Sequence, residues 1–170
     1  EYISEQKSES STCLVVASAG EKWDELVCDT VERGLGGIEN LSLIPGLVGA
    51  APVQNIGAYG VELADILEWV EVFDIETNKF VRLSREDCRF EYRMSVFKTQ
   101  PGKKFIVTKV ALRLRKFFPH SGCEIAVDSY SPNISYKDLS QYFLDADIDR
   151  PTIQDVRNAV IVIRNRKLPD

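Results

Sequence analysis

The chain has 170 residues, of which 44% are hydrophobic, and it can therefore bury one sizeable core, because the buried fraction of surface rises with chain length. Its formal net charge of −5 gives no broad positive surface of the kind that nucleic acids or anionic membranes attract. We expect neither a nucleic-acid nor a membrane partner, so any bound anion must be held by backbone amides and a few local Lys or Arg side chains.

The chemistry-bearing residues outside any motif are few. The cysteines are widely spaced, form no CxxC pair and predict neither a metal site nor a disulfide scaffold: Cys13, Cys28, Cys88 and Cys123. His120, the only histidine, has no nearby carboxylate or cysteine pattern, and we assign it no role. The start has no initiator Met and no secretory-signal pattern, so we expect a cytoplasmic protein and a chain cut from a longer one.

The first third of the chain predicts a strand, a helix and a long irregular loop. Alternating residues over 12–17 indicate the strand. The helix is indicated by apolar residues at helical spacing, Trp23, Leu26, Val27 and Val31, and Gly34 is expected to close it. Residues 37–60 are rich in Pro and Gly, lack a sustained period and carry few charges, which is typical of a buried loop with short helical turns.

A hairpin and a further strand are predicted next. Residues 66–75 and 80–83 alternate on either side of a turn and should pair, and 105–114 form another alternating run. Ser84 with an acid at Asp87 resembles a helix N-cap, so a short helix is expected before the next aromatic residue.

Two helices are expected near the end. One follows the irregular stretch 117–133. The last begins at Thr152, with Asp155 three residues on, and carries an apolar stripe of Val156, Ala159, Val160 and Ile163. Hairpins mixed with helices, without a regular strand-helix-strand repeat, predict an α+β fold: an antiparallel sheet flanked by helices.

The loop 37–60 carries the most specific pattern. Gly46, Gly49 and Gly57 remove side chains, so that the backbone can approach a flat polar ligand closely. Tight helix packing is the alternative for an isolated pair of glycines. Over this length, with Gln54 and Asn55 embedded, ligand binding is the better interpretation.

Three ordered motifs resemble one family. Residues 44–60, Ile-Pro-Gly-Leu-Val-Gly-Ala-Ala-Pro-Val-Gln-Asn-Ile-Gly-Ala-Tyr-Gly, resemble the flavin-binding signature of UDP-N-acetylenolpyruvoylglucosamine reductases, known as MurB. Residues 88–98 are similar to the family's "C-x-F-x-YR-x-S-x-FK" box, and 163–170 to its "IR-x-x-KLPD" box.

This resemblance implies a flavoenzyme of peptidoglycan precursor synthesis. In the family, NADPH reduces bound FAD, and the flavin passes hydride to UDP-N-acetylglucosamine enolpyruvate, which gives UDP-N-acetylmuramate. It also implies the family's second FAD-binding lobe over 1–116, a loop and short helix over 117–150, and a helix over 151–170 that leads to a substrate domain.

The resemblance further assigns site residues. Arg93 is expected to be catalytic, because a planar guanidinium can hold the substrate carboxylate and stabilise the negative charge that develops after hydride addition. FAD is expected to contact Ile44, Pro45, Gly46, Gly49, Ala50, Ala51, Val53, Asn55, Gly57 and Arg164. Substrate is expected to contact Tyr59, Tyr92, Arg93, Tyr136 and Lys167.

Purely structural roles for these residues stay open. Arg93 could form a surface ion pair, Tyr59 could be a core aromatic residue, and the cations of the last helix could simply complement its dipole. Glu91 and Met94 stand where the family usually has Gly and Asp. The chain also stops before the family's catalytic serine segment and lacks the family's early Gly-Gly-Gly-Ser-type loop, so we expect a truncated, inactive piece. The alternative is a non-catalytic flavin or nucleotide-sugar binding module.

Overall fold

A computed structural model describes residues 11–118 and 130–167. His120, Cys123 and the Leu-Pro-Asp end of the last motif lie outside the described residues. Within the described part, no helix is long and apolar enough to cross a membrane.

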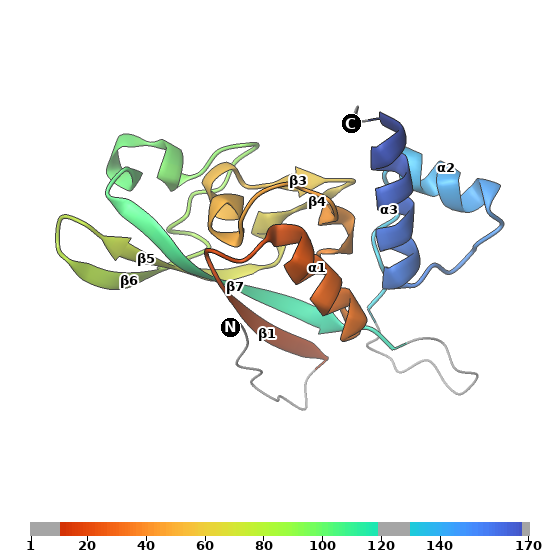
Figure 1. The fold of residues 1–170 in the computed structure, drawn as a ribbon, viewed down its shortest axis with the longest axis horizontal. Coiled ribbons are helices and arrows are strands. Elements are labelled where there is room, and N and C mark those ends of the chain that lie inside the picture. The colour runs from red at the N-terminus through yellow and green to blue at the C-terminus, as the bar shows by residue number, and fades with distance from the viewer. Residues whose placement is uncertain (1–10, 119–129, 168–170) are drawn as a thin grey trace.

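One antiparallel sheet organises the molecule (Figure 1). Its strands follow the order β1-β7-β5-β6, and the short β2 joins the end of β7. The strand bounds are β1 Thr12–Ser18, β2 Leu35–Gly36, β5 Leu67–Asp74, β6 Lys79–Ser84 and β7 Phe105–Lys116. A separate two-stranded ribbon pairs β3 (Gly57–Ala58) with β4 (Val61–Glu62).

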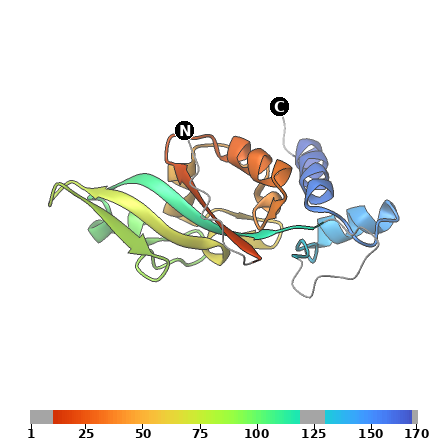
Figure 2. The ribbon, with the colours of Figure 1, turned by 90° about the horizontal axis from the view of Figure 1, so that it is seen from below.

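Within residues 11–118 and 130–167, three α-helices and several 3₁₀ turns complete the fold. The α-helices are α1 (Trp23–Glu32), α2 (Lys137–Asp145) and α3 (Ile153–Lys167). The 3₁₀ turns are η1 (Glu39–Leu41), η2 (Val48–Gln54), η3 (Leu63–Asp65), η4 (Val96–Lys98) and η5 (Gln100–Gly102). Seen from below, α1 lies on one side of the sheet, and α2 and α3 stand together at its end (Figure 2).

The main core lies between the sheet and the segments that cover it. Val70 and Val72 of β5 are fully buried, whereas the intervening Glu71 is not, so the alternation in the sequence corresponds to the two faces of the strand. Each apolar residue that predicted α1 is at most 5% exposed. The expected strands, the hairpin, α1 and the antiparallel α+β class are thus confirmed.

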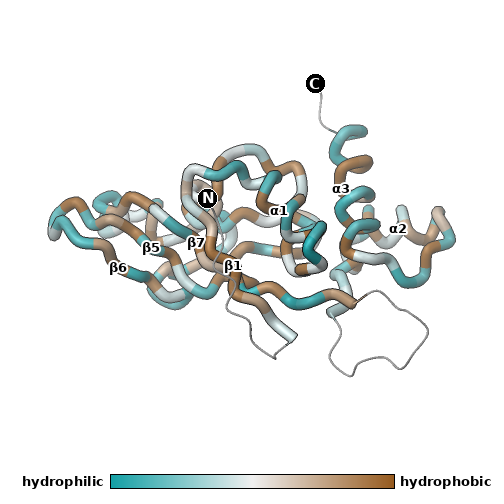
Figure 3. Tube along the Cα trace, turned by 60° about the horizontal axis from the view of Figure 1, so that its bottom comes forward, coloured by the Kyte–Doolittle hydropathy of each residue, from teal (hydrophilic) through white to brown (hydrophobic). Residues whose placement is uncertain are grey.

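A second, smaller core joins α2 and α3. It contains the whole predicted stripe of α3, together with Leu139 and Phe143 of α2. The tube of α3 alternates between hydrophobic and hydrophilic turns (Figure 3). As predicted, α3 begins after Thr152, whose hydroxyl accepts a hydrogen bond from the Asp155 backbone N–H (3.1 Å), while the Asp155 carboxylate accepts one from the Thr152 N–H (2.8 Å).

The prediction of a short helix after Ser84 is wrong, because residues 85–89 form a turn. The reciprocal capping bonds do form, from the Ser84 N–H to Asp87 Oδ2 (2.9 Å) and from the Asp87 N–H to Ser84 Oγ (3.2 Å). The chain then makes a single turn, because Arg89 adopts a φ of +48°, outside the right-handed helical region. A capping pair therefore fixed a turn and did not start a helix.

Candidate functional site

Residues 37–60, called the glycine-rich loop below, are held against the first turn of α1 by hydrogen bonds. The Trp23 backbone N–H donates to the Gly46 carbonyl oxygen (3.0 Å), and its indole N–H donates to the Leu41 carbonyl oxygen (3.0 Å). The Leu43 N–H donates to Asp24 Oδ1 (2.7 Å), which helps to hold Leu43 at a φ of +56°. The loop is irregular in sequence but fixed in place by these contacts.

A cavity of about 620 Å³ opens beside this loop. Its wall on the loop side is made by Gly46, Gly49, Ala50 and Val53, four of the residues expected to contact FAD. Phe105 and Lys103 contribute to the opposite side. A Cβ built on Gly46 would meet nothing within 4 Å, so the bare backbone faces open space there. A cavity with small side chains on one side, and with an apolar strand residue and an exposed lysine on the other, fits a flat ring system that carries polar edges.

The other residues expected to contact FAD do not line this cavity. Ala51 is buried and Ile44 packs against the main core, so these two support the loop from behind. Asn55 is 1% exposed, and its side chain is used internally. It donates to Glu62 Oε2 (2.7 Å) and to the Glu91 carbonyl oxygen (3.2 Å), and it accepts from the Ala64 N–H (2.9 Å).

The side chain of Arg93 points at the same loop. Its Nη2 donates to the Gly57 carbonyl oxygen (2.5 Å), and its Nη1 donates to the Asn55 carbonyl oxygen (3.4 Å). Arg93 itself has a φ of +55°, and its guanidinium carbon lies 5.5 Å from the ring centre of Tyr92. Tyr92 is 80% exposed. Arg93 is thus an exposed cation whose direction is set by two backbone oxygens, with Met94 in place of the acid usual in the family.

A second group of expected residues gathers where the loop meets α2 and α3. The rings of Tyr59 and Tyr136 lie edge to face, 5.4 Å apart. Burial raises the pKa of Tyr59, whereas the charges of Arg164 and Lys167 act to lower it, which places both cations near this phenol. The structure therefore brings together four residues that are far apart in sequence.

The two cations of this group differ in their partners. Lys167 Nζ forms an ion pair with Asp138 of α2, and this pair raises the pKa of Lys167. The buried Nε of Arg164 has no hydrogen-bond partner within residues 11–118 and 130–167. An unpaired buried donor is costly, and a bound anion would satisfy it. Arg164, expected to contact FAD, lies in this group and not at the cavity of the glycine-rich loop.

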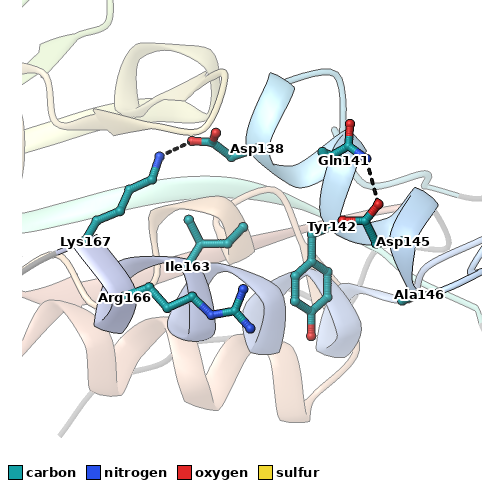
Figure 4. A pocket seen from close by; sticks show the side chains of 8 residues that line it. All are labelled: Asp138, Gln141, Tyr142, Asp145, Ala146, Ile163, Arg166 and Lys167. Carbon is teal, nitrogen blue, oxygen red and sulfur yellow. Dashed lines mark hydrogen bonds and ion pairs between the residues drawn. The ribbon is translucent and has the colours of Figure 1, made fainter.

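A groove of about 500 Å³ extends from Lys167 between α2 and α3 (Figure 4). Tyr142 and Ile163 give it apolar surface, and Arg166 reaches across it. The ion pair of Lys167 with Asp138 closes one end, and a hydrogen bond from Gln141 to Asp145 (2.7 Å) lies at the other. No local sequence pattern marks this groove, because its residues come from two helices that only the fold brings together.

Similarity to known proteins adds independent evidence. Residues 4–84 match a family model described as an FAD binding domain. The UDP-N-acetylenolpyruvoylglucosamine reductase of Neisseria gonorrhoeae is 46% identical over 92% of this chain and 42% of the relative. The enzyme of that name from Dechloromonas aromatica is 43% identical over 96% of this chain and 46% of the relative. The chain is homologous to the UDP-N-acetylenolpyruvoylglucosamine reductases.

A solved structure of an enzyme of this kind has a similar fold. The UDP-N-acetylenolpyruvylglucosamine reductase (MurB) from Thermus caldophilus superposes with a TM-score of 0.61 and 28% identity, over 91% of this chain and 44% of that one. The resemblance drawn from the three motifs and the fold class are confirmed. The chain spans less than half the length of the curated relatives it matches.

Proposed function

We propose that this chain forms the flavin-binding part of a reductase that uses NADPH and FAD to reduce UDP-N-acetylglucosamine enolpyruvate to UDP-N-acetylmuramate. The observation that carries the proposal is the cavity beside the glycine-rich loop, in a chain homologous to reductases of that name. The proposal includes a cytoplasmic location. It also includes the division of the chain into a flavin-binding lobe (1–116), a connecting loop and helix (117–150) and a last helix (151–170).

FAD would supply the hydride chemistry, and the protein would supply position and charge. Gly46, Gly49, Ala50 and Val53 would lie against the flavin, because they wall the cavity and the first three present at most a methyl group. Ile44, Pro45, Ala51, Asn55 and Gly57 would shape the loop around it. For Asn55 this role follows from its inward hydrogen bonds to the backbone at Ala64 and Glu91.

Arg93 would act on the reacting end of the substrate. Its guanidinium is aimed by the carbonyl oxygens of Asn55 and Gly57, and the N–H groups not used there remain for a carboxylate. The cation would stabilise the negative charge that develops next to that carboxylate after hydride addition. The exposed Tyr92 would lie beside the same group.

The diphosphate of the substrate would be held at the second group of residues, by Tyr59, Tyr136 and Lys167, beside Arg164, which would contact FAD. The unpaired Nε of Arg164 supplies a donor, and Lys167 adds a charge that Asp138 now neutralises. Tyr59 and Tyr136, in contact edge to face, could add phenol hydroxyls. Because the relatives are more than twice as long, we expect the rest of the reductase to complete the reaction and this chain to be inactive alone.

Flavin titration tests the proposal. FAD fluorescence should be quenched by the chain, and Gly46→Ala should weaken binding, because its methyl group projects into the cavity at a φ of +116°. Gly20→Ala is the matched control, since its Cβ also meets nothing within 4 Å but its backbone is not left-handed. A wild-type chain that leaves FAD fluorescence unchanged would contradict the proposal.

The second candidate is a non-catalytic flavin or nucleotide-sugar binding module, for which the supporting observation is Met94 beside Arg93, in place of the acid usual in the family. Oxidation of NADPH in the presence of the enolpyruvyl substrate separates the two, when measured on the polypeptide at its natural length. Flavin binding without substrate-dependent oxidation would favour the module.

A further inference from the structure

A charged bridge crosses the junction between α1, α3 and the glycine-rich loop. Arg157 of α3 makes two parallel contacts with the Asp24 carboxylate, Nη1 to Oδ1 (2.8 Å) and Nη2 to Oδ2 (3.0 Å). Its Nη1 also donates to the hydroxyl oxygen of Ser42 (3.0 Å), and Ser42 in turn donates to the Glu39 carbonyl oxygen (2.6 Å).

The same carboxylate holds the backbone of the loop. Asp24 Oδ1 accepts the Leu43 N–H at 2.7 Å as well as Arg157 Nη1. Leu43 precedes Ile44 and Gly46, and the Gly46 carbonyl oxygen accepts the Trp23 N–H from the same helix turn. One carboxylate thus joins a buried cation of α3 to the entrance of the segment that walls the cavity.

Stability alone does not account for this bridge. The Arg157 side chain is only 9% exposed, so forming the pair costs desolvation of both charges. Buried ion pairs are often no more stabilising than apolar residues of similar volume. Their geometry, by contrast, is directional, because a planar fork matches a carboxylate in one orientation.

Through α3, the bridge is also connected to Arg164 and Lys167, the two cations near Tyr59. Arg164 follows Arg157 by about two helical turns, so the two side chains leave neighbouring parts of one face of α3. The charge of Arg164 is near enough to act on Asp24. A shift of α3 relative to Leu43 would therefore move Arg164 relative to the glycine-rich loop.

We propose that Asp24, Ser42 and Arg157 are positioning residues that fix the glycine-rich loop relative to Arg164 of α3, so that one bound FAD can contact both. This inference rests on the proposed function, since it assigns a shared dinucleotide to the two places. The three residues touch the loop and the helix, and they act on the ligand only through them.

The mechanical part of the inference is tested without any ligand. In the full chain, Arg157→Lys keeps the charge but loses the fork that reaches both oxygens of Asp24. Backbone hydrogen exchange at Leu43 and Gly49 should then be about 5-fold faster or more, while exchange in β5 and β7 should be unchanged. Unchanged exchange at Leu43 would overturn the inference, whether or not the chain binds flavin.

The functional part uses FAD as the probe. Arg157→Lys and Ser42→Ala should each raise the Kd for FAD about 5-fold or more, the size of a typical coupling between sites. Val72→Ala in β5 is the control, a truncation in the core that should lower the melting temperature without changing the Kd.

The outcomes separate the two hypotheses. Faster exchange together with a raised Kd supports the bridge as a positioning device. Faster exchange with the Kd unchanged shows a purely structural bridge and overturns the inference. If the wild-type chain binds no FAD, the proposed function fails, and with it the assignment of a shared dinucleotide.

Discussion

Gly49→Ala is expected to distort the cavity wall, because the position has no room for a methyl group. A Cβ at residue 49 would lie 2.6 Å from the Cβ of Ala19 and 3.2 Å from both its Cα and its carbonyl oxygen. All three atoms belong to, or are fixed on, the backbone at the end of β1. No rotamer change can relieve the contact, so the loop must move away from the sheet. The hydrogen bond from the Gly49 N–H to the Ala19 carbonyl oxygen (2.9 Å) would lengthen in the process.

The cost follows from this geometry. Overpacking of this kind typically lowers the free energy of unfolding by about 1 to 3 kcal/mol. In a domain of this size, each kcal/mol corresponds to a fall of roughly 2 to 4 °C in melting temperature, so a drop of about 2 to 12 °C is expected. Thermal unfolding followed by circular dichroism measures it. Since Gly49 lines the cavity, FAD titration should show weaker binding by the same variant.

A second substitution tests the cause. Ala19→Gly removes the methyl group at 2.6 Å, so the double variant should recover part of the melting temperature that Gly49→Ala loses. The contacts at 3.2 Å remain, and recovery should be incomplete. If Gly49→Ala unfolds at the wild-type temperature, or if Ala19→Gly adds its own cost without any recovery, the steric reasoning is wrong.

Three other expectations follow. In the reductase at its natural length, Arg93→Ala should lower the rate of NADPH oxidation roughly 100- to 1000-fold, the usual loss for an oxyanion contact, while the melting temperature stays nearly unchanged because the side chain is exposed; Arg93→Lys should recover only part of the rate. Burial raises the pKa of Glu39 above its ordinary 4.5. The protonated Glu39 therefore contributes stability that is present below pH 4.5 and is lost as pH rises through the raised pKa. Glu39→Gln should flatten this fall in the free energy of unfolding, measured by urea unfolding between about pH 4 and pH 8. Asp138→Asn should release Lys167 and tighten the binding of UDP, the nucleotide of the substrate, measured by calorimetry, and a weaker affinity would indicate that the pair only holds α2 in place.

The sequence predicted the parts of the fold whose pattern is local. The period of two in β5 and the helical spacing in α1 each report which side of an element meets the core, and the structure buries Val70, Val72 and Trp23 accordingly. The glycine-rich loop could also be found, because backbone approach to a ligand requires small residues in series. Its cavity, however, depends on Lys103 and Phe105, which follow an ordinary turn signal and carried no mark of a ligand site.

The sequence could not show which hydrogen-bond and ion-pair partners a polar side chain has in the folded chain. Asn55 is expected to contact FAD, and the structure shows that its amide also satisfies backbone groups of two other segments. Arg157 belongs to a helix that the sequence predicts, yet its partner Asp24 lies in α1, far away in sequence. Such pairings are set by packing between elements, and no local pattern encodes them.

The position of β7 in the sheet has a consequence for how the chain folds. β1 (Thr12–Ser18) pairs in full with β7 (Phe105–Lys116), with Thr12 opposite Arg115. The hairpin of β5 and β6 can close within microseconds, but β1 must wait for roughly 100 further residues, on the order of 5 to 20 seconds of synthesis. During that time its apolar residues and open edge have no native partner, so nascent chains that stop before β7 should be prone to aggregation and should depend on chaperones.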